Sequence, residues 1–122
     1  MKHSAKIAHG VAVALLLTLG TSAAQESCRK PEADIVIPDG EAATKDQMID
    51  AQAKVNTFLD KMNGYLECLD ERNGALPADE SGNRARIINE ARYRAALDEM
   101  QGLAEKFNLQ VRVYKLRSER PD

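Results

Sequence analysis

The stretch of sequence that decides the fold is TKDQMIDAQAKVNTFLDKMNGYLECLDER, residues 44–72. Its apolar side chains recur at spacings of three and four residues, which is the period of one face of an α-helix. Thr44 and Gln47 form a capping-box pattern at its start, and Asn73-Gly74 followed by Pro77 is a stop signal. The sequence therefore predicts a helix over residues 45–72. Its buried stripe is expected to contain Met48, Ala51, Val55, Phe58, Leu59, Met62, Tyr65, Leu66 and Leu69.

A second helix is predicted to begin between residues 79 and 81, where Asp79 or Ser81 can act as the N-cap. Its apolar face is expected to contain Ala85, Ile88, Ala95, Ala96, Met100, Leu103 and Phe107. Beyond Phe107, Val111 and Tyr114 continue this stripe, whereas residues 111–113 alternate like a strand. Because no Gly or Pro interrupts the chain before Pro121, we favour a helix to about Arg117, with a strand as the alternative.

The N-terminal segment, residues 1–24, has the pattern of a secretory signal peptide. Lys2 and Lys6 precede a mostly apolar run over residues 7–19, and Ser22-Ala23-Ala24 is a small-residue cleavage signal. The apolar run is shorter than the roughly 20 residues of a membrane-spanning helix. We therefore predict cleavage after Ala24 and a periplasmic or secreted protein, with an uncleaved anchor as the alternative.

Cleavage changes the composition on which a function can be argued. The whole chain has 122 residues, with 17 basic and 19 acidic side chains. Without positions 1–24 the length is 98, and the loss of Lys2 and Lys6 leaves 15 basic against 19 acidic side chains, a net charge of −4. His3 and His9 are also lost, which removes the commonest general base and metal ligand. This length allows one small domain.

Several classes of function are excluded on this composition. The absence of His from residues 25–122 excludes Ser-His-Asp and Cys-His catalytic groups in the cleaved chain, and no glycine-rich phosphate loop is present. A calcium loop counted from Asp70 fails, because Ala75 and Ser81 stand where Gly and Glu are required. Near-neutral charge and few aromatic residues argue against a nucleic-acid partner. We expect no enzyme activity, no metal and no cofactor.

Two cysteines, Cys28 and Cys68, are expected to form one structural disulfide, because an exported chain meets an oxidising compartment. A reactive thiol or redox pair is the alternative, but no C-x-x-C motif supports it. Between Cys28 and Thr44, two prolines and Asp39-Gly40 favour an extended path.

The lengths of the first helix and of the segment before it determine the path that the chain must take for Cys28 to reach Cys68. Cys68 lies about 36 Å along the first helix from Thr44, at a rise of 1.5 Å per residue. The sixteen residues from Cys28 to Thr44 can span about 53 Å when extended. If the bridge forms, the segment must therefore run back antiparallel to the first helix, with Ile35-Val36-Ile37 over the groove between the helices.

These inferences combine into an all-α fold, an antiparallel two-helix hairpin over residues 45–122 with an extended arm over residues 25–44 attached by one disulfide. Short motifs in the arm and both helices carry a resemblance to known proteins. They are Cys28, Ile37-Pro38-Asp39-Gly40, Ala51-Gln52, Tyr65-Leu66-Glu67-Cys68, Asp98-Glu99-Met100, Phe107-Asn108 and Tyr114-Lys115. On these residues the chain resembles an uncharacterised family of small exported proteins from Gram-negative bacteria. The resemblance implies export, a cysteine pair and a helical hairpin, and it implies no activity.

Two polar residues, Arg92 and Glu99, fall in the apolar sector of the second helix. One interpretation makes them a polar recognition pair. We favour the other, in which Arg92 extends its head to solvent or pairs with Asp60, its rough opposite in an antiparallel hairpin.

The candidate interaction surface lies at the C-terminal end, where the second helix is expected to overhang the first. It consists of Val111, Arg112, Val113, Tyr114, Lys115, Leu116 and Arg117. Exposed apolar residues bordered by charge are typical of a protein contact or a membrane-surface contact. Packing against the arm, or fraying, is the alternative interpretation.

From these residues we expect a non-enzymatic interaction protein of the cell envelope, an adaptor, assembly factor or chaperone. Its partner would be another envelope protein or a second copy of itself, bound by helix-in-groove contact or as a four-helix bundle. The alternative is a membrane-surface protein that uses its basic amphipathic C-terminus.

Overall fold

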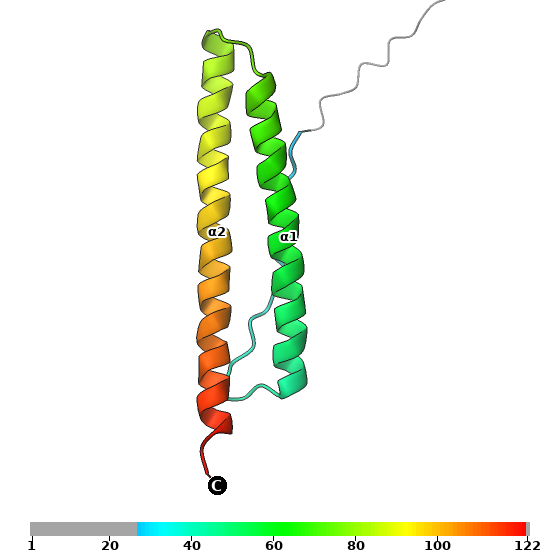
Figure 1. The fold of residues 1–122 in the computed structure, drawn as a ribbon, viewed down its shortest axis with the longest axis vertical. Coiled ribbons are helices and arrows are strands. Elements are labelled where there is room, and N and C mark those ends of the chain that lie inside the picture. The colour runs from blue at the N-terminus through cyan, green and yellow to red at the C-terminus, as the bar shows by residue number, and fades with distance from the viewer. Residues whose placement is uncertain (1–26, 122) are drawn as a thin grey trace, which may run out of the picture.

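The computed structural model describes residues 27–121, and within that range it contains two helices and no strand. Helix α1 spans Lys45–Ala75 and helix α2 spans Glu80–Ser118. Figure 1 shows the two helices side by side, joined by a short loop, so that the chain leaves along α1 and returns along α2. The prediction of an all-helical fold is confirmed. The predicted signal peptide, residues 1–24, lies outside the described residues, as do Gln25 and Glu26.

The start of α1 follows from its capping residues. The Gln47 N–H donates to Oγ1 of Thr44 at 3.2 Å, and the Thr44 N–H donates to Oε1 of Gln47 at 2.8 Å, so the capping box is complete. The predicted stop at Asn73-Gly74 is wrong, because α1 continues to Ala75. The helix ends where Leu76 becomes extended (φ −71°, ψ 141°), the conformation that a following proline favours.

Helix α2 begins with a second side-chain cap. Asp79 accepts a hydrogen bond of 2.8 Å from the Gly82 N–H, and this bond, with a further one from the Ser81 hydroxyl, lowers the pKa of the Asp79 carboxyl. The helix then continues through residues 108–117 and ends at Ser118, close to the predicted end. The helical interpretation of this segment is confirmed and the strand alternative is wrong.

The core lies between the helices in two adjacent clusters. One contains Phe58, Met62, Tyr65, Leu66, Leu69 and Ala96, and the other contains Ala43, Met48, Ala51, Val55 and Phe107. Core side chains repeat every seven residues in both helices, as Met48, Val55, Met62 and Leu69 and as Tyr93, Met100, Phe107 and Tyr114. A seven-residue repeat is that of a left-handed coiled-coil contact.

The two apolar stripes were predicted with unequal success. Every residue of the α1 stripe is buried except Leu59, which is half-buried. On α2 the prediction is wrong for Ile88 and Ala95, which are exposed, while Asn89 is buried. The seven-residue repeat places Asn89 and Ala96 inward, so the residue before each is turned about 100° away from α1.

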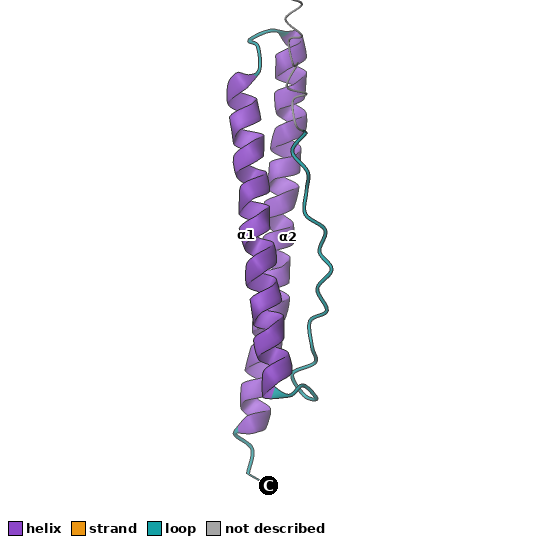
Figure 2. Ribbon diagram, turned by 90° about the vertical axis from the view of Figure 1, so that its right-hand side faces the viewer, coloured by secondary structure: helices purple, strands orange, loops and turns teal. Residues whose placement is uncertain are grey.

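The arm, residues 27–44 of the described chain, has no helix or strand and lies along one face of the helix pair (Figure 2). Cys28 and Cys68 form the predicted disulfide, with their Cα atoms 5.7 Å apart. Ile35 packs against both core clusters and Ile37 packs against the second. The expectation that Val36 also covers the groove is wrong, since it is 83% exposed. Successive side chains of an extended chain point in opposite directions, so only alternate residues face the helices.

Candidate interaction surfaces

The end of α2 was expected to lack intramolecular partners, and for most of its residues this is wrong. Val111 and Tyr114 pack against the cluster that contains Ala43 and Met48. The α2 segment beyond Phe107 therefore shares a core with the start of α1. The alternative interpretation, packing against the arm, also applies here, because the last residues of the arm fold against α2.

A turn over residues 39–43 makes this contact. The Ala43 N–H donates to the Asp39 carbonyl at 2.8 Å, which closes the turn. The Gly40 N–H then donates to Oε1 of Gln110 at 2.8 Å. Arg117 donates from one guanidinium nitrogen to the Glu41 carbonyl at 2.5 Å and from another to the Ala43 carbonyl at 2.6 Å. This turn joins the arm to the last three turns of α2.

Gly40 allows the turn to approach the helix so closely. A Cβ atom at this position would lie 2.8 Å from the Tyr114 nitrogen and 2.9 Å from Cβ of Val113, and it would also overlap the Gln110 carbonyl. These neighbours are backbone atoms and a Cβ, which do not move aside. Val113 is therefore half-buried against the arm, and it does not form an open surface.

Three residues of the predicted surface remain exposed: Arg112, Lys115 and Leu116. Leu116 is 67% exposed, and Leu109, two helical turns before it, is 49% exposed. The basic character of this end is reduced by pairing, because Arg120 forms a 2.7 Å ion pair with Glu41. The Arg117 guanidinium also lies 5.1 Å from the centre of the Tyr114 ring, within range of a cation–π contact.

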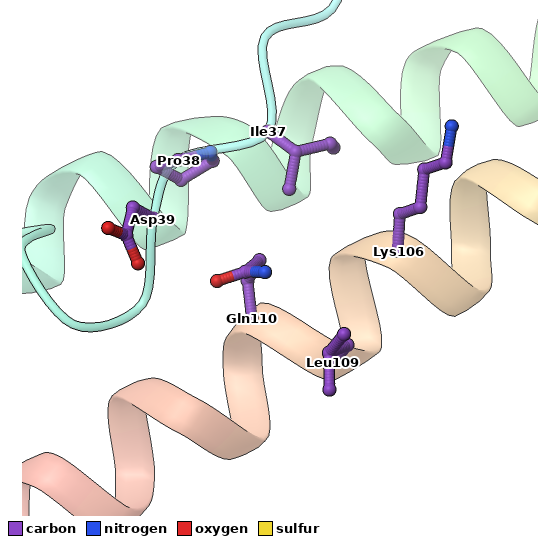
Figure 3. A pocket seen from close by; sticks show the side chains of 6 residues that line it. All are labelled: Ile37, Pro38, Asp39, Lys106, Leu109 and Gln110. Carbon is purple, nitrogen blue, oxygen red and sulfur yellow. The ribbon is translucent and has the colours of Figure 1, made fainter.

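Shallow grooves border the arm on both sides. One, of about 290 Å³, lies against α2 and is lined by Ile37, Pro38, Asp39, Lys106, Leu109 and Gln110. Figure 3 shows Gln110 projecting from α2 toward the arm. The other groove, of about 360 Å³, lies against α1, with Ile35 and Phe58 among its lining residues and Lys54 and Lys61 beside them.

The two polar residues in the apolar sector of α2, Glu99 and Arg92, have different surroundings. Glu99 forms an ion pair with Lys30, so it helps to attach the arm to α2. Arg92 is exposed, in agreement with the interpretation that its head extends to solvent, and the alternative pair with Asp60 is not among the ion pairs of residues 27–121. Sequence reasoning missed the Lys30–Glu99 pair because it joins residues 69 positions apart.

The shifted pKa values in the structure arise from contacts within a single helix. The pKa of Lys54 is raised, first by its hydrogen bond to Asp50 and then by the charge of that carboxylate. The side chains of Asp50, Lys54 and Asp79 are exposed, so both effects belong to the helix surface. Within residues 27–121, no group of three or more Cys, Asp or Glu side chains is placed to hold a metal ion.

A further surface lies on the side of the helix pair turned away from the arm, which we call the arm-free face (Figure 2). A hollow of about 200 Å³ lies on this side, because Asp70, one of its lining residues, is turned about 200° around α1 from Cys68, which is bonded to the arm. Its lining residues are Asp70, Asn73, Glu90, Tyr93 and Arg94. Leu97, one heptad after Glu90, is 44% exposed.

Among residues 27–121, neither helix contains an apolar stretch that could span a membrane.

Comparison with protein-family models, with curated proteins and with solved structures found no match of any kind.

Proposed function

We propose that the chain is an exported, non-enzymatic interaction protein of the cell envelope, acting as an adaptor, assembly factor or chaperone. In this proposal residues 27–121 form an antiparallel helical hairpin that the disulfide and the arm hold rigid. The observation that carries the proposal is Leu116, 67% exposed at the end of α2 with Arg112 and Lys115 exposed beside it. An apolar side chain bordered by charge in this way is suited to a protein contact.

Export is supported by two features. Residues 1–24 have the signal-peptide pattern, and the Cys28–Cys68 disulfide is compatible with an oxidising compartment. We accordingly propose a periplasmic or secreted location, with cleavage after Ala24.

The contact itself is proposed to use the outer side of α2 near its C-terminus. Leu109, Arg112 and Leu116 follow one another at spacings of three and four residues, so they lie on one side of the helix. A partner helix or groove would cover the two leucines and place an acidic side chain against Arg112. The partner would be another envelope protein or a second copy of the chain.

The proposal is tested by photocrosslinking in cells. The chain, with its predicted signal peptide, is produced in a Gram-negative bacterium with a photoreactive amino acid at Leu116, and an otherwise identical chain carries it at Val36. Val36 is 83% exposed but lies on the arm, so it is a matched control. We expect the protein in the periplasmic or external fraction, with a discrete adduct from position 116 only, and loss of that adduct in R112E. A cytoplasmic location, or the same adducts from both positions, would contradict the proposal.

The alternative, a membrane-surface protein, uses the same basic end of α2. Arg112 and Lys115 are free to approach anionic headgroups, but Arg117 and Arg120 are engaged by the arm. This engagement is why we place the protein contact first. Binding of the purified protein to vesicles containing anionic lipid, abolished by R112E, would favour the alternative.

A further inference from the structure

The arm-free face carries opposite charges at its two ends. At the loop end, one hollow is lined by the acidic residues Asp70 and Glu90 and by the basic residue Arg94. The net charge of its lining is therefore −1. At the other end are Lys45, the first residue of α1, and Lys115, which follows the packed residue Tyr114. All four side chains are exposed, and none belongs to the ion pairs found among residues 27–121.

Helix geometry places each lysine on the same side as its acidic counterpart. The interval from Lys45 to Asp70 in α1 equals the interval from Glu90 to Lys115 in α2. Each interval is close to seven full helical turns, so both members of each pair share one side of their helix. Because Asp70 and Glu90 meet in the hollow, both lysines belong to the arm-free face as well.

Apolar side chains lie between the charged ends. Leu97 is 44% exposed and stands one heptad after Glu90, and Ile49 is 53% exposed and stands three heptads before Asp70. Leu59 and Tyr93 are half-buried and pack on the core below them. The arm covers the opposite face with Ile35 and Ile37, and no described segment does so here.

We propose that the arm-free face binds the same face of a second copy of the chain, with the two hairpins antiparallel to each other. The proposal goes beyond the proposed function, because it adds a second contact on a face other than the side of α2 that carries Leu109 and Leu116. A two-fold axis across the middle of the helices, near Leu59 and Ala104, superposes each end of one copy on the other end of its partner. Lys45 then faces Asp70 of the second copy, and Lys115 faces Glu90 of the second copy. The result is a four-helix bundle.

The charges also exclude the other face-to-face arrangement. A two-fold axis parallel to the helices would pair equal ends, bringing Lys45 beside Lys115 of the second copy and Asp70 beside Glu90. Like charges at close range oppose association. The antiparallel dimer makes opposite charges meet at both ends, and symmetry forms each pair twice.

The test uses the purified, oxidised protein alone and two double variants, D70K/E90K and K45E/K115E. We expect the unaltered protein to dimerise at concentrations up to about 100 µM in sedimentation equilibrium. Each variant should dimerise about tenfold more weakly or worse, because like charges then meet at both ends. An equal mixture of the two variants should recover association, because each supplies the charge that the other lacks, and added salt should reduce all of these differences.

The orientation is tested separately with a photoreactive residue at Ile49, which is 53% exposed. An antiparallel dimer places it near residues 63–70 of α1 in the second copy, whereas a parallel dimer places it near residues 108–115 of α2. Mapping of the crosslinked peptide distinguishes the two, and the same residue at Val36 is the control that should give no dimer adduct. A dimer crosslinked to residues 108–115 would overturn the proposed orientation.

Monomeric protein at every concentration tested, or variants that associate as well alone as in the mixture, would overturn the dimer. Such a result is distinguishable from failure of the proposed function, because the Leu116 adduct is measured in cells with a different residue on a different face. A monomer that still forms that adduct rejects the dimer alone.

Discussion

The backbone N–H of Gly40 donates a 2.8 Å hydrogen bond to Oε1 of Gln110, 70 residues away. This bond attaches the C-terminal end of the arm to α2. The disulfide attaches the other end of the arm to α1, and the Lys30–Glu99 pair adds a contact to α2 close to it. The arm is thus held at both ends. Its two inward isoleucines lie between these attachments and extend a core that two helices alone would leave open on this side.

Replacing Gly40 with Ala is expected to destabilise the protein and release the turn over residues 39–43. The added Cβ overlaps backbone atoms of α2, and overpacking of this kind costs about 1–3 kcal/mol. Urea unfolding measures the loss, and faster amide exchange at Gly40 and Glu41 locates it. Gly64→Ala is the control, because a Cβ there meets nothing within 4 Å, and it should raise the free energy of unfolding by up to about 1 kcal/mol. Equal effects of both substitutions would contradict this account.

Removing the disulfide is expected to lower the free energy of unfolding by about 4 kcal/mol, since the bridge closes a loop across 40 positions. The matched variant C28S/C68S removes both thiols, so no unpaired cysteine remains. Urea unfolding of this variant against the oxidised protein gives the difference. Amide protection should be lost first in the arm, because its N-terminal end is then held only by the Lys30–Glu99 pair and side-chain packing. A variant with undiminished stability would show that the bridge does not hold the arm.

The contributions of Asn89 and Asn73 to the free energy of unfolding are expected to be coupled. Asn89 is buried and donates a 2.9 Å hydrogen bond from Nδ2 to Oδ1 of Asn73, which links α2 to the end of α1. Replacing Asn89 with Ala removes this bond from the half-buried Asn73 oxygen, at a cost of about 0.5–1.5 kcal/mol. In a double-mutant cycle with N73A, the two substitutions should be non-additive by roughly 0.5 kcal/mol or more. Strict additivity would mean that the bond contributes nothing to stability.

Asp79 is expected to make the stability of α2 dependent on pH in the acid range. Hydrogen bonding lowers its pKa in the folded state below the ordinary value of 3.8, so the ionised cap stabilises the fold above that value. This contribution is lost as the pH falls through the folded-state pKa. In D79N, which keeps a capping side chain without a charge, the same contribution is absent at all pH values. The stability difference between the two proteins should therefore be constant above about pH 5 and diminish below about pH 4. A constant difference down to the lowest pH would contradict the assignment.

The parts of the fold that the sequence predicts are those encoded locally. The α1 stripe from Met48 to Leu69, the Thr44–Gln47 box and the Asp79 cap each follow from residues within a few turns of one another. The disulfide also follows, because the chain contains only two cysteines.

The parts that sequence reasoning missed depend on contacts between distant segments. The end of α2 looks unpartnered in the sequence because its partners, Gly40, Glu41 and Ala43, lie 70 to 76 positions earlier. The exposure of Ile88 and burial of Asn89 depend on the rotation of α2 against α1, which the weak periodicity before Tyr93 does not define. The predicted interaction surface is accordingly smaller in the structure than in the sequence.

A count of free thiols tests both the proposed export of the chain and the disulfide that holds its arm. The chain is produced with its predicted signal peptide, recovered from the periplasmic or external fraction without reductant, and titrated for thiols after unfolding. We expect no titratable thiol, because Cys28 and Cys68 are bonded to each other. Two titratable thiols in each chain, or recovery of the protein from the cytoplasm alone, would contradict it.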